Sequence, residues 1–180
     1  MNQVIKRLLH FIIQPFFNFI FYIHLKFCRQ KKLCIVDIDN TVADTWRALQ
    51  NKSGSTKNVL KNLKAFTQMH AKVIEYENAG FSIVFLSVRN YSYYFVTKNW
   101  LIKNGFPVTF SNVILVDKPQ TKADLIGKYA GKFEIVFIDD LSFNHEAGEV
   151  KFYKETIENI KKLPIKYIGF DEINRINEQS

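Results

Sequence analysis

Two aspartates separated by one residue follow an apolar run near the start of the sequence. The stretch LCIVDIDNTVADT, residues 33–45, places Asp37 and Asp39 directly after apolar positions. A carboxylate can attack phosphorus and form an aspartyl-phosphate, which splits a difficult hydrolysis into two easier steps. A neighbouring carboxylate can protonate the leaving oxygen and later deprotonate water. The pair could therefore serve as nucleophile (Asp37) and as acid and base (Asp39).

Polar residues also end two later apolar runs. Ser87 closes SIVFLS, and Asp139 and Asp140 close EIVFIDD. Ligands of parallel α/β sheets bind at the carboxyl ends of the strands. If the run before Asp37 is the central strand, all three groups converge on one crevice.

Several carboxylates in one crevice repel one another unless a cation is present. Mg²⁺ is suited to such a site, because it takes oxygen ligands and retains waters. We expect its protein ligands to be Asp37, the backbone carbonyl of Asp39 and an aspartate of the pair Asp139 and Asp140. Ser87 could donate a hydrogen bond to phosphoryl oxygens.

The elements that must position these residues alternate along the chain. Apolar, β-branched runs separated by amphipathic stretches predict a parallel sheet covered on both faces. Gly80 and Gly105 follow two of the helical stretches, where glycine suits a left-handed cap. The expected strands are 33–38, 82–87, 112–116, 134–139 and 166–170, and the expected helices are 57–79, 91–104, 121–130 and 150–162.

The motifs DIDNT (37–41), SVR (87–89) and DDLSFN (139–144), with a lysine before the last, resemble those of the haloacid dehalogenase superfamily of phosphotransferases. The resemblance covers nearly all of residues 33–180. It implies a three-layer, Rossmann-like parallel sheet and a Mg²⁺-dependent phosphatase acting through an aspartyl-phosphate. It also implies the acid–base role of Asp39.

Other site residues follow from the same resemblance. Thr41, Ser87 and Arg89 are candidates for phosphate binding, although Arg89 could instead orient its loop. Either Lys122, favoured by its spacing, or Lys118, which precedes a proline, would add a positive charge. Asn144 could support the metal ligands.

Only about a dozen residues, 45–56, separate the first motif from the next expected helix. We therefore expect a site without a sizeable cap, open to a bulky phosphorylated lipid or saccharide precursor or closed by another subunit of a homo-oligomer. The SVR form is similar to the 3′-phosphatase part of polynucleotide kinases, which makes a nucleic-acid 3′-end phosphatase one alternative. A non-catalytic, membrane-tethered scaffold on the same fold is another.

The basic charge of the chain is concentrated in residues 1–32. This segment holds six of the 25 Lys and Arg residues and none of the 17 Asp and Glu residues, so it carries +6 of the net +8. The remainder is nearly neutral, which disfavours a nucleic-acid partner. The two cysteines, Cys28 and Cys34, do not form a disulfide framework, and a reducing cytoplasm is the default expectation.

Residues 8–25 of this segment, LLHFIIQPFFNFIFYIHL, contain no Asp, Glu, Lys or Arg. They predict an N-terminal hydrophobic helix, and the aromatic content and flanking basic residues favour a membrane anchor, either spanning or interfacial. A helix packed on its own domain or on a dimer partner is the main alternative, and a signal peptide is a lesser one. The expected organisation is thus an N-terminal segment, 1–32, and a phosphatase domain, 33–180.

Overall fold

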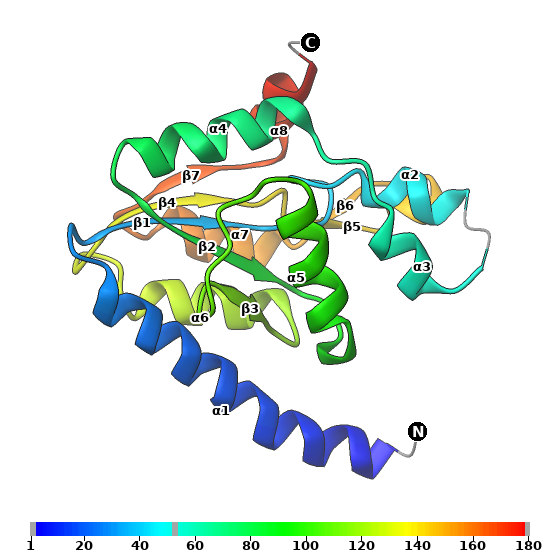
Figure 1. Cartoon of the computed structure of the whole chain (residues 1–180), viewed down its shortest axis with the longest axis horizontal. Helices are drawn as coiled ribbons and strands as arrows, with labels where there is room; N and C mark the ends of the chain where they lie inside the picture. Colours follow the sequence, from blue (N-terminus) through cyan, green and yellow to red (C-terminus); the bar gives the residue numbers. More distant parts are fainter. Residues whose placement is uncertain (1–2, 52–53, 179–180) are drawn as a thin grey trace.

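A computed structural model describes residues 3–51 and 54–178 of the protein. Its main sheet is parallel, with strand order β3-β2-β1-β4-β7 (Figure 1). β1 is central, so the carboxyl ends of β1, β2 and β4 are neighbours, and the predicted parallel α/β sheet is confirmed. The strands are β1 Lys32–Val36, β2 Ser82–Ser87, β3 Val113–Leu115, β4 Glu134–Ile138 and β7 Lys166–Ile168.

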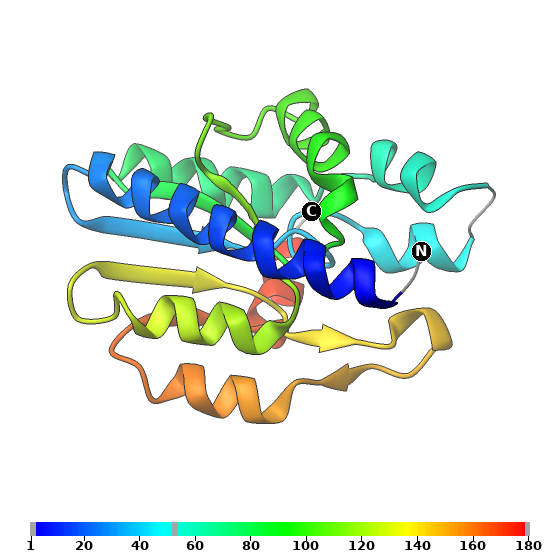
Figure 2. The same ribbon diagram turned by 90° about the horizontal axis from the view of Figure 1, so that it is seen from below.

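Helices cover both faces of this sheet, as the continuous apolar character of its strands requires. α4 (Thr67–Asn78) and α8 (Phe170–Glu178) lie on one face; α1 (Gln3–Phe27), α6 (Pro119–Gly127) and α7 (Lys154–Lys161) lie on the other (Figures 1 and 2). Alternate residues of β1 serve the two cores. Cys34 and Val36 pack towards α4, whereas Leu33 and Ile35 pack towards α1 and α6. α5 (Tyr94–Lys103) joins the α4 side through Trp100 and Leu101.

The predicted helix 57–79 is interrupted. α3 (Thr56–Lys61) ends before α4 begins, because residues 64–66 pair with the loop after β1. The Phe66 amide donates to the Val42 carbonyl at 2.9 Å, and the Asp44 amide donates to the Lys64 carbonyl at 2.9 Å.

The predicted helix 150–162 begins only at Lys154. Residues Lys151–Phe152 form β6, which pairs antiparallel with β5 (Ser142–Phe143). Three further elements lie outside the predicted set: α2 (Thr45–Gln50), the 3₁₀ turn η2 (His145–Ala147) and α8. Gly80 and Gly105 have φ angles of 86° and 75°, so both adopt the left-handed conformation predicted for them.

α1 packs on the sheet through one side. Phe17, Phe21 and Leu25 are buried in the apolar cluster that also contains residues of β1, β4 and α6. His24 is buried between two serines: its Nδ1 lies 3.2 Å from the Ser111 hydroxyl and its Nε2 lies 2.8 Å from the Ser82 hydroxyl. The described part of the chain contains no helix that is both long and apolar enough to cross a bilayer.

Candidate active site

The polar residues that end β1, β2 and β4 meet at one edge of the sheet. The ladder continues past β1, since the Asp37 amide donates to the Ile138 carbonyl at 2.8 Å. The chain then curls tightly, because the amides of residues 41 to 43 all donate to the Ile38 carbonyl and Asn40 has a φ of 57°. Thr41 is buried in this curl, and its hydroxyl accepts from the Asp140 amide at 3.4 Å. Thr41 thus joins the loop after β1 to the loop after β4.

A lysine from α6 reaches into the same place. The Lys122 ammonium donates to Asp37 Oδ1 at 2.5 Å and to Asp139 Oδ2 at 2.6 Å, and all three side chains are buried. Burial alone would lower the pKa of Lys122, but Asp139 and Asp37 together hold it above its usual value. Lys118, the alternative, is exposed at the start of α6. The structure therefore places Lys122 and not Lys118 beside the candidate nucleophile.

The acidic cluster has the chemistry of a divalent cation site. Asp37, Asp139 and Asp140 are buried and offer carboxylate oxygens that lie within 4.8 Å of one another. Burial raises the pKa of Asp37 to about 7; Lys122 opposes this rise, and Asp139 adds to it. Burial is also the largest cause that raises the pKa of Asp139 and of Asp140.

The net charge of the ionisable side chains in the site also favours a bound divalent cation. The site brings together four carboxylates, including that of Asp39, and two cationic side chains, Lys122 and Arg89. When all six are ionised, they leave two negative charges unbalanced, and all of them except the partly exposed Asp39 are buried. Hard oxygen ligands with this excess of charge fit Mg²⁺.

Asp140 is held by residues that the sequence analysis did not assign to the site. Ser142 donates a short hydrogen bond to Asp140 Oδ2 and also contacts Nε2 of the buried His145. That ring nitrogen lies 3.7 Å from the same carboxylate oxygen. Asn144, expected near the metal ligands, instead donates to the Glu149 carbonyl at 3.1 Å. The turn that begins with Asn144 in a left-handed conformation brings His145, one residue later, to the carboxylate.

Asp39 is paired with Arg89. The guanidinium donates to both carboxylate oxygens, from Nε at 2.8 Å and from Nη2 at 2.6 Å, and the Thr45 hydroxyl donates to Asp39 Oδ1 at 2.7 Å. Burial would raise the pKa of Asp39, but Arg89 and then Thr45 outweigh it and hold this pKa below its usual value. Ser87, at the end of β2, points to the same group and donates to Asp39 Oδ2 at 3.3 Å.

The Arg89 side chain is held in place by a residue of α5. Its Nη1 donates to the Thr97 hydroxyl of α5 at 3.0 Å, and both side chains are buried. Arg89 thus orients the acid–base candidate in this structure. Thr45 and Thr97 were not predicted, because a lone threonine on a helix carries no local sequence signal of such a partner.

Three cavities adjoin these residues. A small one of about 130 Å³ is lined by Asp37, Asp39, Ser87, Lys122 and both aspartates after β4. A second, of about 320 Å³, shares Asp39 and Ser142 with it and continues past Trp46 and Tyr93.

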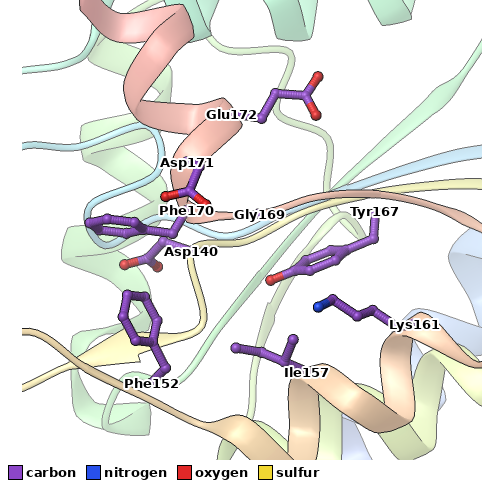
Figure 3. Close-up of a pocket in the computed structure, with 9 residues that line it drawn as sticks. All are labelled: Asp140, Phe152, Ile157, Lys161, Tyr167, Gly169, Phe170, Asp171 and Glu172. Atoms are coloured by element: carbon purple, nitrogen blue, oxygen red, sulfur yellow. The ribbon is translucent and has the colours of Figure 1, made fainter.

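The third cavity, of about 480 Å³, lies between α7, β7 and the start of α8 (Figure 3). Phe152 and Phe170 form its aromatic wall, with ring centroids 5.1 Å apart. Asp140 lines both this cavity and the small one. Asp37 lines only the small cavity, and Asp39 lines the small and the second cavity.

The fold has a counterpart among solved structures. The chain is similar to a class C acid phosphatase from Bacillus anthracis, solved with tungstate bound, with a TM-score of 0.55. The match covers 90% of this chain and 80% of the other, at 17% sequence identity. No family model and no curated protein matches the sequence. The structural match shows that the chain shares the fold of that structure, which agrees with the parallel α/β sheet expected from the sequence.

Proposed function

We propose that the protein is a Mg²⁺-dependent phosphomonoester hydrolase that acts through an aspartyl-phosphate on Asp37. The observation that carries the proposal is the position of this carboxylate. It is buried after the central strand, paired with Lys122, and grouped with two further carboxylates that could share a divalent cation. A purely structural pair of strand-end aspartates would not require this accumulation of buried negative charge.

The chain supplies the groups for both chemical steps. An Asp37 oxygen attacks phosphorus while the bond to the leaving alcohol oxygen breaks, and Asp39 gives that oxygen a proton. Water then attacks the phosphorus, Asp39 takes the proton from the water, and the Asp37 carboxylate is regenerated with release of phosphate. Mg²⁺ held by Asp37, the Asp39 carbonyl and the pair after β4 would reduce the repulsion between the carboxylate and the phosphoryl oxygens.

Asp39 must gain a proton to act as the acid, yet Arg89 holds it ionised in the structure. A phosphate dianion bound beside Ser87 competes for the same guanidinium, because arginine binds phosphate as well as carboxylate through paired donors. We therefore expect substrate binding to weaken the Arg89–Asp39 pair. Release of Arg89 would let Asp39 take up its proton and would add a donor to the phosphoryl oxygens.

The surroundings support a substrate with a large alcohol part. α2 and α3, six residues each, are the helices described between β1 and α4, and we propose that no domain-sized cap covers the site. The cavity of about 320 Å³ beyond Asp39 would receive the leaving alcohol. Its lining mixes Trp46 and Tyr93 with the amide of Asn90. Such a mixture suits a ring with polar substituents, as in a saccharide precursor or a lipid headgroup.

The test is phosphate release by the full chain from a panel of phosphomonoesters, with Mg²⁺ and with chelator. The panel would contain sugar, nucleotide, lipid and DNA 3′-phosphates. We expect metal-dependent release that Asp37→Asn abolishes and that Asp124→Asn, at an exposed position of α6, leaves unchanged. Release that survives in Asp37→Asn, or no release from any substrate by the folded chain, would refute the proposal.

A further inference from the structure

The side of α1 that faces away from the sheet is aromatic. Phe16, Phe19, Tyr22 and Phe27 are exposed by 57%, 59%, 43% and 71%. Their spacing places them on one face of the helix, opposite the buried Phe17, Phe21 and Leu25. Solvent exposure of large apolar side chains in one contiguous group is typical of an interaction site.

The aromatic face, defined as Phe16, Phe19, Tyr22 and Phe27, belongs to α1, and the buried Phe17 joins this helix to α5. Ring contacts run from Phe16 to Phe17 at 5.9 Å, from Phe17 to Tyr94 at 5.5 Å and from Tyr94 to Phe95 at 5.3 Å. Phe95 is itself 76% exposed. Because Phe17 is buried, these contacts hold α1 against α5 from the side opposite the aromatic face.

Positive charge gathers near the C-terminal half of α1. The Lys26 ammonium lies 5.1 Å from the Tyr22 ring centroid, and the exposed Arg29 and Lys31 follow in the chain. Lys128 and Lys132 are exposed on the turn after α6, beside Tyr129, whose ring contacts Phe21 of α1 at 5.6 Å. Residues 1–32 contain no Asp or Glu.

We propose that the aromatic face binds the surface of an anionic lipid bilayer, with α1 lying parallel to that surface. Aromatic rings insert at the boundary between headgroups and acyl chains, and flanking lysines and arginines attract anionic lipids. Charge favours this occupant over a second copy of the chain. A two-fold contact through the same face would bring two basic segments together, and like charges oppose such an interface.

The same helix contacts the loop that carries Arg89. The Tyr91 hydroxyl donates to Gln14 Oε1 at 2.6 Å, and the Tyr91 ring stacks on Phe17 with centroids 5.5 Å apart. The N-terminal half of α1 extends towards the edge where β1 and β4 end (Figures 1 and 2). Docking through the aromatic face would therefore hold the candidate active site close to the membrane surface.

The experiment measures flotation of the full chain with vesicles of phosphatidylcholine alone and with vesicles containing roughly one-third phosphatidylglycerol. We expect binding to the anionic vesicles that weakens with salt. Phe16→Ser with Phe19→Ser should weaken it by about tenfold or more, since two inserted rings are lost. Lys26→Gln with Arg29→Gln should weaken it several-fold and reduce its salt dependence.

Two variants serve as matched controls. Val150→Ser changes an exposed apolar residue of the β5–β6 connection, and Lys161→Gln with Lys162→Gln removes two exposed charges at the end of α7. Both should float like the wild-type chain, and thermal unfolding should show that every variant is folded. Asp37→Asn should also bind the anionic vesicles normally, because the aromatic face and the hydrolase site are separate parts of the protein.

Several results would overturn the proposal. One is a wild-type chain that floats with neither vesicle, and another is a Phe16/Phe19 variant that floats as well as wild type. A third is a wild-type dimer that this variant converts to monomers without any vesicle binding, which would assign the aromatic face to a second copy. Phosphate release from a soluble ester by the same variant reports on the hydrolase independently, so failure of one proposal is distinguishable from failure of the other.

Discussion

His24 should make the packing of α1 on the sheet sensitive to acid. The imidazole is buried between Ser82 and Ser111, neither of which titrates, and burial lowers its pKa from 6.5 to about 4. With Ser82 donating to Nε2, the Nδ1 proton is free to bond Ser111. The neutral ring can satisfy both serines in this way, whereas a second ring proton would place a charge in an apolar core.

The sign of the effect follows from the two pKa values. Between pH 6.5 and pH 4 the unfolded chain binds a proton at His24 that the folded chain does not, so the free energy of unfolding falls as the pH falls. The contribution is fully present above pH 6.5 and is lost progressively towards pH 4. For these pKa values the loss between pH 7 and pH 5 is about 2 kcal/mol.

The assay is urea denaturation of the full chain and of His24→Gln at pH 7 and pH 5, in the same buffer and salt. Buried carboxylates also titrate, but they contribute equally to both proteins. The wild-type chain should therefore lose about 2 kcal/mol more than the variant over this interval. His70→Gln, at a partly exposed histidine that contacts the Gly105 carbonyl, should behave like wild type. If the free energy of unfolding changed equally with pH in wild type and in His24→Gln, the buried His24 ring would not be the source of acid sensitivity.

Three further predictions concern the candidate site. Arg89→Gln should lower kcat/KM by roughly 10²–10³-fold, and Arg89→Lys should restore only part of it, because lysine cannot reproduce the paired contact with Asp39; steady-state kinetics would measure both. Lys122→Met should lower the free energy of unfolding in chelator by about 3–5 kcal/mol, measured by urea denaturation, because two buried carboxylates lose their shared partner. Mg²⁺ should raise the melting temperature of the wild-type chain, and Asp140→Asn should reduce this rise in calorimetry.

These predictions can each fail. Arg89→Gln with unchanged kinetics would leave Arg89 a purely structural partner of Asp39. An undiminished free energy of unfolding in Lys122→Met would mean that its two carboxylates are not both ionised in the folded chain. If Mg²⁺ raised the melting temperature of Asp140→Asn as much as that of the wild-type chain, the cation would not be bound by the Asp140 carboxylate.

The sheet was predictable because its strands are buried on both faces. Residues such as Leu33 and Val36 face different cores, so the strand appears as a continuous apolar run rather than an alternating one. The polar residues at the ends of these runs then identify the functional edge. Helix boundaries were less predictable, since the break at residues 62–66 depends on backbone bonds to a loop some twenty residues earlier.

Partners of the site residues were the least predictable part. Asp37 and Lys122 are 85 positions apart, and only the fold shows that they touch. Asn144 fits the expected motif position, but a left-handed turn directs its side chain to a backbone carbonyl and brings His145 to Asp140 instead. Local spacing carries no information about such a turn.

The N-terminal segment illustrates the same limit. Its apolar residues fall on all sides of a helical projection, so composition alone did not distinguish a helix buried in its own domain from one in a membrane. The structure separates the residues by position. Phe17 and Phe21 pack on the sheet, whereas Phe16 and Phe19 remain exposed.

The most direct test of the central claim is acid quenching of the full chain during turnover of the best substrate, labelled in its phosphoryl group. We predict a labelled protein whose phosphate maps to the peptide containing Asp37, is released by hydroxylamine as expected of an acyl phosphate, and is absent from Asp37→Asn. Phosphate release without any labelled peptide, or a label that remains in Asp37→Asn, would contradict the assignment of Asp37 as the nucleophile.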